Sequence, residues 1–294
     1  SEIWPNLILN AKKRNIPIAL INARLTKKSY DRWFRFSKTA KKLFSKFDLC
    51  LSSNLETKDF LKNLDAKNIC FTGNIKLINE IDIKKIENKN KTILQANRFW
   101  LAASTHKEEE IFCLNVHLEL KKIYENIITI IAPRHINRSK EIKILAENLN
   151  LKVQILNKDD LISENNEIII INSFGILQDY FKYAKSVFIG KSMIERLKND
   201  SGQNPIDAAK LNCKIYHGPY VNNFKDIYDI LEKHNISEKI ENSKELSENL
   251  KKDLKSHIKI YEQTDNIIDH LGQKTLFDTM KNVKDFIFND IKKT

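Results

Sequence analysis

Short apolar runs alternate along this chain with longer stretches in which apolar residues recur every three or four positions. The short runs are typical of strands buried in a parallel sheet, and the longer stretches are typical of amphipathic helices that cover it. The pattern predicts strands at 16–21, 48–52, 69–72, 100–103, 127–132, 153–156, 168–171, 186–189 and 213–217. It predicts helices at 5–14, 28–44, 55–64, 107–124, 225–233, 243–254, 257–271 and 276–291. This alternation predicts an α/β fold.

A stretch without a hydrophobic period divides the chain. Residues 80–98 are rich in Lys, Asn and Ile, and we interpret 81–98 as a linker between two domains. The domains then cover residues 1–80 and 99–294, and each shows the strand and helix alternation of a Rossmann-like domain. With 294 residues, of which 41% are hydrophobic, the chain is long enough to bury two ordinary cores.

Two polar loops late in the predicted sheet combine glycine with the signals that start a helix. The chain has only six glycines, and Gly202 and Gly218 are two of them. In the first loop Asn204 can cap the next helix, Pro205 fits its first turn, and Asp207 lies near its positive end. Gly202 is expected to adopt a positive φ or to lie close to a ligand. Ligands of open α/β sheets bind outside the carboxyl ends of the strands, so these loops predict a ligand site.

Two further predicted strands end in polar residues that suit a phosphate. Ser104, Thr105 and His106 follow one strand, and Arg134 and His135 follow the next. An Arg and a His between a strand and a helix are placed to meet a phosphate. For the acidic run that follows, charge compensation at the start of a helix is a sufficient structural explanation. For His135, an ordinary surface position is an equal alternative.

The charge of the chain favours partners that carry phosphate. Lys and Arg number 50 against 38 Asp and Glu, a formal net charge of +12, which favours nucleic acid, anionic lipid or a phosphorylated substrate. A lysine content inflated by biased base composition is an alternative explanation. Nucleic-acid binding predicts aromatic residues interleaved with basic ones, and Trp33, Phe34, Arg35 and Phe36 form the one such cluster in the sequence. We expect this cluster to pack on the sheet, and therefore expect no nucleic-acid partner.

The cysteines and the hydropathy exclude other classes. The four cysteines are scattered, with no Cys-x-x-Cys spacing and no clustered His, which argues against a zinc site or a disulfide framework and suits a reducing compartment. No stretch approaches the roughly 20 apolar residues of a membrane span. The chain begins at Ser1 rather than Met, and we interpret it as part of a longer protein.

Seven short motifs follow one another in the order found in a known family. They are Glu-Ile-Trp-Pro-Asn at 2–6, Asn-Ala-Arg at 22–24, Thr-Gly-Asn-Ile-Lys at 72–76, Ala-Ala-Ser-Thr-His at 102–106, Pro-Arg-His at 133–135, Gly-Gln-Asn-Pro-Ile-Asp-Ala-Ala at 202–209 and His-Gly-Pro at 217–219. The chain therefore resembles the 3-deoxy-D-manno-octulosonic acid (Kdo) transferases, which move Kdo from CMP-Kdo to lipid A precursors. The family's Asp-Thr-Met-Gly-Glu-Leu and Gly-Gly-Ser motifs are altered here by Asn172, Ile176 and Lys191, whose effect stays open.

The resemblance implies a fold and a separate role for each of the two domains. It implies two Rossmann-like domains of the GT-B glycosyltransferase type, the first of them incomplete. Residues 1–80 would be the second half of the acceptor-binding domain, and 99–294 would bind the CMP-sugar and end in helices. The absent half would carry the membrane anchor and a glycine-rich loop with the catalytic base. We therefore expect the chain to bind CMP but to transfer Kdo slowly.

The resemblance also assigns candidate residues. Glu2 is the candidate catalytic residue, with charge compensation of the N-terminal helix as its alternative. Arg24 and Lys76 are candidates to bind Kdo or the acceptor. The nucleotide-binding candidates are Ser104, Thr105, His106, Arg134, His135, Phe174, Gly175, Gly202, Asn204 and Asp207. No cofactor and no metal are expected.

The implied partners place the protein at a membrane. They are the CMP-Kdo donor, a lipid A precursor as acceptor, and peripheral contact with an anionic membrane, at the cytoplasmic face of the bacterial inner membrane. Two alternatives stay open at this point. One is an enzyme of the same two-domain fold that uses a different nucleotide sugar, and the other is a basic protein that binds nucleic acid.

Overall fold

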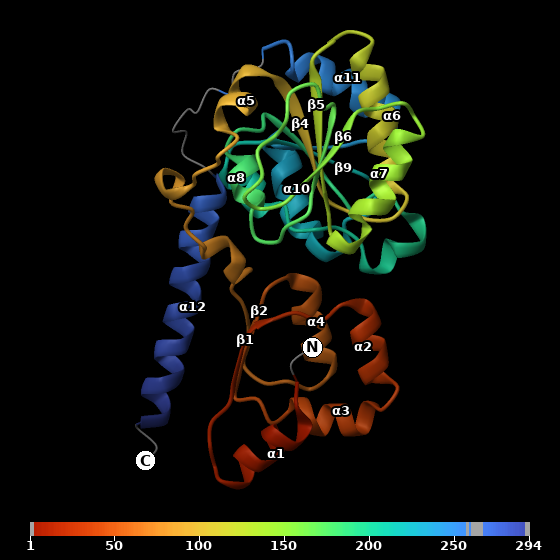
Figure 1. Ribbon diagram of the computed structural model, residues 1–294. Helices are drawn as coiled ribbons and strands as arrows, with labels where there is room; N and C mark the ends of the chain where they lie inside the picture. Colours follow the sequence, from red (N-terminus) through yellow and green to blue (C-terminus); the bar gives the residue numbers. More distant parts are fainter. Residues whose placement is uncertain (1–2, 257–258, 260–266, 292–294) are drawn as a thin grey trace. The chain divides into compact units, whose positions relative to one another are not determined.

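The computed structural model describes residues 3–256, 259 and 267–291, and it forms two compact units (Figure 1). The first unit comprises Ser1–Glu80 and Asp265–Thr294, and the second comprises Ile81–Thr264. Both contain parallel sheets, so the predicted α/β class is confirmed. In the part of the chain that the structure describes, no helix combines the length and the apolar character needed to cross a bilayer.

The first unit is built on a parallel sheet of three strands in the order β1-β2-β3. Its elements are α1 (Pro5–Lys13), β1 (Ala19–Ala23), α2 (Lys27–Phe34), α3 (Ser37–Phe44), β2 (Leu49–Ser52), α4 (Leu55–Asn63), β3 (Ile69–Phe71), the 3-10 helix η1 (Ile75–Ile78) and α12 (Ile267–Ile291). Side chains cap two of the helices, because Thr26 accepts from the Ser29 N–H and Asn54 accepts from the Thr57 N–H. The core lies between the sheet and α2, α3 and α4.

Three predictions for this unit differ from the structure. The helix predicted at 28–44 is two helices, because the backbone leaves the helical region at Phe36, where φ is −114° and ψ is 48°. Strand β1 begins at Ala19 rather than at residue 16, as Pro17 has no N–H to donate to a neighbouring strand. The expectation that the aromatic cluster packs on the sheet is wrong for Phe34 and Phe36, which are 48% and 72% exposed.

The C-terminal helix α12 packs within the first unit. Gly272 and Thr275 bring α12 against η1 and the turn before it, where the Thr275 hydroxyl lies 2.6 Å from the position a side chain at Gly73 would take. This packing differs from the expected grouping of the C-terminal helices with residues 99–294. The helices expected at 257–271 and 276–291 are replaced by one helix at Ile267–Ile291, while 257–258 and 260–266 lie outside the described residues.

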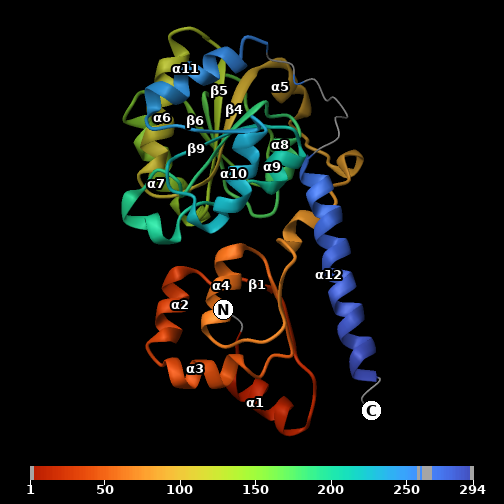
Figure 2. The same cartoon turned by 180° about the vertical axis from the view of Figure 1, so that it is seen from behind.

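The second unit is a seven-stranded parallel sheet with helices on both faces. Its strands are β4 (Arg98–Thr105), β5 (Ile127–Pro133), β6 (Val153–Leu156), β7 (Ile168–Ile171), β8 (Ser186–Ile189), β9 (Lys214–His217) and β10 (Ser237–Lys239). Its helices are η2 (Ile83–Lys85), α5 (Lys91–Ala96), α6 (Glu109–Lys121), η3 (Ile136–Arg138), α7 (Ser139–Glu147), α8 (Leu177–Phe181), η4 (Glu195–Asp200), α9 (Ile206–Lys210), η5 (Asn222–Phe224), α10 (Lys225–Lys233) and α11 (Ser243–Asp253). Figures 1 and 2 show α6, α7 and α11 together on one face of the sheet. The sequence predicted all of these strands except the short edge strand β10.

The strand order β10-β9-β8-β4-β5-β7-β6 fixes where a ligand can bind. After β4 the chain continues toward β5 on one side, and after β8 it continues toward β9 on the other. The chain therefore leaves β4 and β8 toward opposite sides of the sheet, which makes the carboxyl edge at these two strands a topological switch point. Open α/β sheets bind ligands at such a switch point.

The segment expected to be a linker is anchored to the second unit. Lys182 on α8 donates to the carbonyl oxygens of Ile83 and Ile86 at 2.9 and 2.7 Å. The Asn90 side chain accepts from the Ile162 N–H at 2.7 Å. These bonds hold residues 81–98, with η2 and α5, against α8 and the sheet, so the boundary of the compact unit lies near residue 80.

A buried histidine on α6 makes the second unit sensitive to acid. His117 is fully buried, its Nδ1 lies 2.9 Å from the Thr129 hydroxyl, and burial lowers its pKa from 6.5 to about 4. As the pH falls, such a histidine is protonated in the unfolded chain at a higher pH than in the folded protein, because its pKa is higher in the unfolded chain. Its contribution to stability is therefore complete above pH 6.5 and is lost as the pH falls toward 4.

We predict that the free energy of unfolding falls by about 2 kcal/mol between about pH 7 and pH 5 because of His117. Denaturant unfolding at each pH measures it, and His117→Gln should flatten the profile. His234→Gln, which removes an exposed histidine, is the control. Parallel profiles for wild type and His117→Gln would contradict the assignment.

Candidate functional site

The loops after β4 and β8 approach each other so closely that only glycine fits between them. A Cβ at Gly190 would lie 2.6 Å from the Ser104 carbonyl oxygen and 2.7 Å from the Thr105 Cα. Ser104 and Lys191 both adopt the left-handed region, with φ of 57° at each. For a residue with a side chain this conformation costs roughly 1–2 kcal/mol, so other interactions must hold these loops in place.

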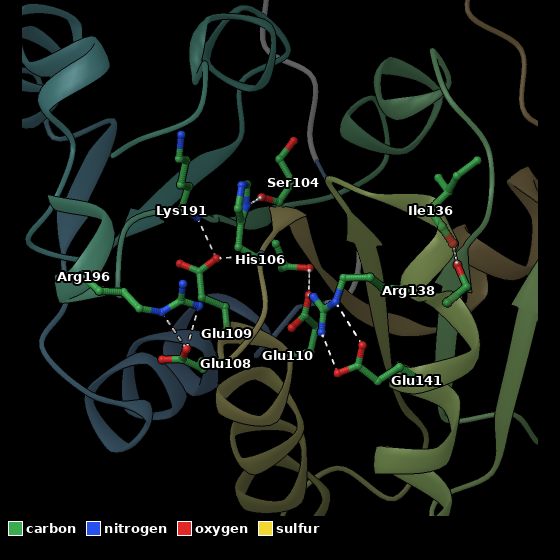
Figure 3. A network of polar contacts seen from close by, with 12 residues as sticks. Ser104, His106, Glu108, Glu109, Glu110, Ile136, Arg138, Glu141, Lys191 and Arg196 are labelled. Atoms are coloured by element: carbon green, nitrogen blue, oxygen red, sulfur yellow. Dashed lines mark hydrogen bonds and ion pairs between the residues drawn. The ribbon is translucent and has the colours of Figure 1, made fainter. Parts of the chain in front are cut away.

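A buried carboxylate supplies that interaction. Glu109, at the start of α6, is 1% exposed and accepts four backbone N–H groups: His106 at 2.9 Å, Lys191 at 2.7 Å, Ser192 at 2.8 Å and Met193 at 3.0 Å. Figure 3 shows Glu109 between His106 and Lys191. Burial raises the pKa of Glu109, and the four N–H donors oppose the rise because they favour the charged form. One side chain therefore ties the loop after β4 to the loop after β8.

A second buried carboxylate engages the arginine on η3. Glu110 accepts from the Thr105 hydroxyl at 3.1 Å and from Arg138 at 2.6 Å. Arg138 also pairs with Glu141, so its guanidinium bridges two carboxylates (Figure 3). Burial raises the pKa of Glu110, and Arg138 opposes the rise. Arg138 is thus occupied in holding the start of α6 to α7.

Four basic side chains lie at or near the loop of Ser104. His106 is half-buried, with Nδ1 3.3 Å from the Ser104 carbonyl oxygen, and burial lowers its pKa to about 4. Its ring lies 5.7 Å from that of His135, and Lys191 and Arg134 are close enough to lower its pKa further. His106 is therefore neutral near pH 7.

Arg134 differs from Arg138 in having an exposed side chain. Its backbone N–H donates to the Thr105 carbonyl oxygen at 2.9 Å, which fixes Arg134 beside the end of β4. Among the described residues, no carboxylate forms an ion pair with its guanidinium. An exposed arginine beside the switch point can bind a phosphate without first losing an internal partner.

The conformation and the ion pair of Lys191 show how a lysine fits the altered Gly-Gly-Ser motif. Lys191 has a φ of 57°, in the left-handed region that favours glycine, and its ammonium pairs with Asp200 at 3.0 Å. Gly202 donates its N–H to the Lys191 carbonyl oxygen at 2.7 Å, which ties the two loops together. Lys191 therefore both holds the turn in a left-handed conformation and adds a positive charge to the loop after β8.

The loop of Gly202 has the geometry expected from the sequence. Gly202 has a φ of +83°, and a Cβ there would lie 2.8 Å from the Val221 Cα. Ser192 accepts from the Gly218 N–H at 2.9 Å, and Ser201 accepts from the Asn222 N–H at 3.2 Å. The loops after β8 and β9 are thus joined by two serine hydroxyls and by the close approach of Gly202 to Val221, which a larger residue at 202 would prevent.

The remaining nucleotide-binding candidates lie on two other loops. Asn204 accepts from the Ile206 N–H at 3.1 Å, at the start of α9 as expected, but Pro205 takes the N-cap position rather than a place in the first turn. Asp207 accepts from Gln178 on α8 at 3.0 Å. Phe174 is 65% exposed, and Gly175 has a φ of +78° with open space around it, so Gly175 is needed for its backbone conformation.

The candidates of the first unit form a separate group. Asn22 in the Asn-Ala-Arg motif accepts from the Ile75 N–H at 3.2 Å, which joins that motif to the Thr-Gly-Asn-Ile-Lys motif. This bond brings the segments of Arg24 and Lys76 together, and both residues have interactions of their own. Glu2 lies outside the described residues.

Glu109 is the residue that sequence reasoning missed. The acidic run was explained by the charge of a helix end, and that explanation holds in part, because Glu109 reaches back to the His106 N–H as in a capping box. The bonds to Lys191, Ser192 and Met193 come from a loop more than 80 residues later. Within residues 3–256, 259 and 267–291, no group of three His, Cys, Asp or Glu residues is arranged to hold a metal.

Known proteins resemble both parts of the chain. Residues 1–79 match the sequence model of the 3-deoxy-D-manno-octulosonic-acid transferase N-terminal domain. A 3-deoxy-D-manno-octulosonic acid transferase of Rickettsia prowazekii is 30% identical over 297 residues, which cover 98% of this chain and 62% of the relative. The chain spans about half to three fifths of the length of the first curated relatives that it matches.

Solved structures show the same fold. The C-terminal CMP-Kdo binding domain of WaaA from Acinetobacter baumannii is 20% identical with a TM-score of 0.52, covering 67% of this chain and 97% of that one. A glycosyltransferase from Rickettsia africae is 14% identical with a TM-score of 0.54, covering 100% and 84%.

The two units, the parallel sheets and the loops at the switch point define the fold of the GT-B glycosyltransferases. The motif order, the N-terminal domain match and the curated relatives narrow the class further. The chain belongs to the 3-deoxy-D-manno-octulosonic acid transferase family.

We predict that Glu109→Gln destabilises the second unit by at least about 3 kcal/mol, because the amide NH₂ would face two backbone N–H donors and the buried charge that they solvate would be lost. Denaturant unfolding measures this. The matched control is Glu108→Gln, which removes an exposed ion pair with Arg196 and should cost about 0.2–1 kcal/mol. Equal costs for the two substitutions would contradict the role of Glu109.

Proposed function

We propose that this protein is a glycosyltransferase that transfers Kdo from CMP-Kdo to a lipid A precursor, with the nucleotide bound by the second unit. The observation that carries the proposal is the exposed Arg134 beside the switch point, next to the loop of Ser104–His106, with no ion pair to a carboxylate of the described residues. A cation of this kind can neutralise the phosphate that leaves with CMP. The likeness to a domain described as CMP-Kdo binding supports the choice of donor.

The proposed roles follow from the partners each residue has. Arg134 binds the phosphate, and Lys191 can turn from the exposed Asp200 to add a second positive charge. Neutral His106 can donate or accept a hydrogen bond without repelling Arg134. Asp207, held by Gln178, is placed as an acceptor for the ribose hydroxyls.

Seven further candidates shape the nucleotide pocket. Ser104 and Thr105 position the loop after β4, and Phe174 and Gly175 form an exposed loop after β7 that can cover a base. Gly202 and Asn204 fix the loop before α9, and His135 adds a basic ring beside His106. The protein's task in this chemistry is positioning and charge stabilisation.

The transfer step needs a base for the acceptor hydroxyl. The bond between the anomeric carbon of Kdo and the phosphate oxygen breaks, the phosphate takes the electron pair, and the acceptor oxygen forms the new bond while losing its proton. We assign Glu2 as the candidate base within this chain. Arg24 and Lys76 are assigned to the Kdo carboxylate or to the acceptor, at the cytoplasmic face of the inner membrane.

Calorimetry of the purified chain with CMP, UDP and GDP tests the nucleotide. CMP should bind at least about tenfold more tightly than UDP or GDP, since base readout by a few hydrogen bonds is worth about 1.4 kcal/mol or more. A preference for UDP or GDP would indicate another nucleotide sugar. Incubation with CMP-Kdo and a lipid A precursor then tests the transfer, and the absence of Kdo-lipid even with a full-length relative's N-terminal half added would contradict it.

We predict that Arg134→Ala weakens CMP binding by about 1.5–3 kcal/mol, the range for a hydrogen bond to a charged group, and leaves the fold intact. Calorimetry measures the affinity, and thermal unfolding checks the fold. Lys143→Ala, which removes an exposed cation on α7, is the control and should leave CMP affinity unchanged. Unchanged affinity in Arg134→Ala would remove Arg134 from the site.

A further inference from the structure

A polar pocket of about 590 Å³ opens in the second unit between the segment before α5, the loop after β6 and α8. We call it the α8 pocket, and it is lined by residues 84, 86–91, 158–159, 176, 179–180 and 182–183. Its volume is in the range of pockets that enclose a small molecule. None of the nucleotide-binding candidates is among its lining residues, so the binding of CMP does not explain its chemistry.

Hydrogen bonds to the backbone hold the three walls of the α8 pocket together. The Asn88 amide donates to the Asp179 carbonyl oxygen at 3.1 Å, and Lys182 donates to two carbonyl oxygens just before it. The Asn90 amide donates to the Asp160 carbonyl oxygen at 3.2 Å. The segment that leads into α5 lies beside α8 in both views of the fold (Figures 1 and 2). Because the fold itself sets the walls, a ligand binds here with little loss of conformational entropy.

Three lysines of the α8 pocket are available to bind an anion. Lys84, Lys91 and Lys158 come from η2, α5 and the loop after β6, and all three are exposed. None of them forms an ion pair with a carboxylate of the described residues. Lys89 pairs with Asp159 at 2.9 Å, and since both are exposed this pair opens at little cost. Positive charges from three separate elements therefore line one pocket, which favours an anionic ligand.

The helix α8 adds two polar groups that have no internal partner. Asp179 is half-buried, and among the described residues no group forms a hydrogen bond or an ion pair with its carboxylate. Burial raises the pKa of Asp179, and Lys158 and Lys182 oppose the rise. The Tyr183 hydroxyl, also in the pocket, likewise has no hydrogen-bond partner in the part of the chain that the structure describes. A partly buried polar group of this kind is stabilised when a ligand hydroxyl bonds to it.

The buried part of the pocket is apolar. Ile86, Ile176 and Tyr180 line it and are 8, 7 and 3% exposed. Such a surface gains free energy by covering the C–H groups of a ligand ring. The α8 pocket thus combines cations, groups that bond to hydroxyls, and an apolar surface.

From this combination we propose that the α8 pocket binds a sugar phosphate at a site separate from that of the nucleotide. Lys84, Lys91 and Lys158 bind the phosphate. Asp179 and the Tyr183 hydroxyl bind hydroxyls of the sugar, whose ring lies on the apolar surface. A free phosphate would use the lysines but leave Asp179 and Tyr183 without partners, and for this reason the sugar is part of the proposal. The inference does not rest on the proposed function, since no residue assigned to CMP, Kdo or the acceptor lines the pocket.

Calorimetry of the full chain with glucose 6-phosphate, glucose and inorganic phosphate tests the proposal. Glucose 6-phosphate should bind at least about tenfold more tightly than inorganic phosphate, because the sugar adds its own hydrogen bonds. Glucose should bind at least about a hundredfold more weakly than glucose 6-phosphate, because it has no charge for the lysines. Saturating CMP and the substitution Arg134→Ala should both leave the affinity for glucose 6-phosphate unchanged.

Variants of the lining residues locate the site. Lys84→Gln and Lys158→Gln should each weaken the binding of glucose 6-phosphate about tenfold, as each removes a hydrogen bond between charged groups. Asp179→Asn should weaken glucose 6-phosphate but not inorganic phosphate, so the ratio of the two affinities should fall at least about fivefold. The matched control is Lys85→Gln, a neighbouring exposed lysine that pairs with Asp82 and does not line the pocket. Thermal unfolding checks that each variant folds.

Several outcomes would overturn the proposal. Equal affinity for inorganic phosphate and glucose 6-phosphate would indicate an anion site that does not recognise a sugar. Displacement of glucose 6-phosphate by CMP, or its loss in Arg134→Ala, would place it in the nucleotide site instead. Full binding in the Lys84, Lys158 and Asp179 variants, or no binding of any of the three probes, would also contradict it. CMP affinity is measured on the same samples, and its loss while glucose 6-phosphate still binds would contradict only the proposed function.

Discussion

The candidate site depends on the solvation of one buried carboxylate. Glu109 is removed from water, and its charge is stable there only because four backbone N–H groups surround it. Three of those groups belong to the loop after β8, so this loop must close onto the start of α6 whenever the carboxylate is charged. The left-handed conformation of Ser104 and Lys191 is a consequence, since the N–H groups converge only when the chain turns sharply. Strain in the backbone is offset by hydrogen bonds to a charge.

The positions of these two loops in turn determine the positions of the neighbouring loops. Gly190 permits the close approach of the β4 loop, and the Lys191 carbonyl oxygen accepts from Gly202, which in turn lies against Val221. The contacts pass from the loop after β4 to those after β8 and β9, almost entirely through backbone atoms. At Lys191, in the altered Gly-Gly-Ser motif, a side chain is accommodated with a φ of 57°. At Gly190 and Gly202, a Cβ would lie less than 3 Å from backbone atoms of the neighbouring loops.

The sequence predicted what is local and missed what depends on distant contacts. The apolar runs gave every strand of the second unit's sheet except β10, whose sequence Ser-Glu-Lys has no apolar signal. Hydrophobic periodicity does not predict the break between α2 and α3 or the packing of α12 on η1. Both depend on the surface against which each helix packs. The polar strand ends located the candidate site, whereas the role of Glu109 required knowledge of a loop 82 residues later, at Lys191.

The two arginines after β5 differ in their internal partners, and for this reason we propose only Arg134 as a binding residue. Arg138 binds the fully buried Glu110, so removing it would leave a charge unpaired in the interior, at a cost of about 3–5 kcal/mol. Its guanidinium therefore stays where it is, whatever ligand arrives. Arg134 loses only water when it meets an anion, and Lys191 exchanges an exposed carboxylate, Asp200, for a phosphate at little cost. The candidate site thus combines Arg138, on which a buried carboxylate depends, with Arg134 and Lys191, on which no buried carboxylate of the described residues depends and which we propose are available for a ligand.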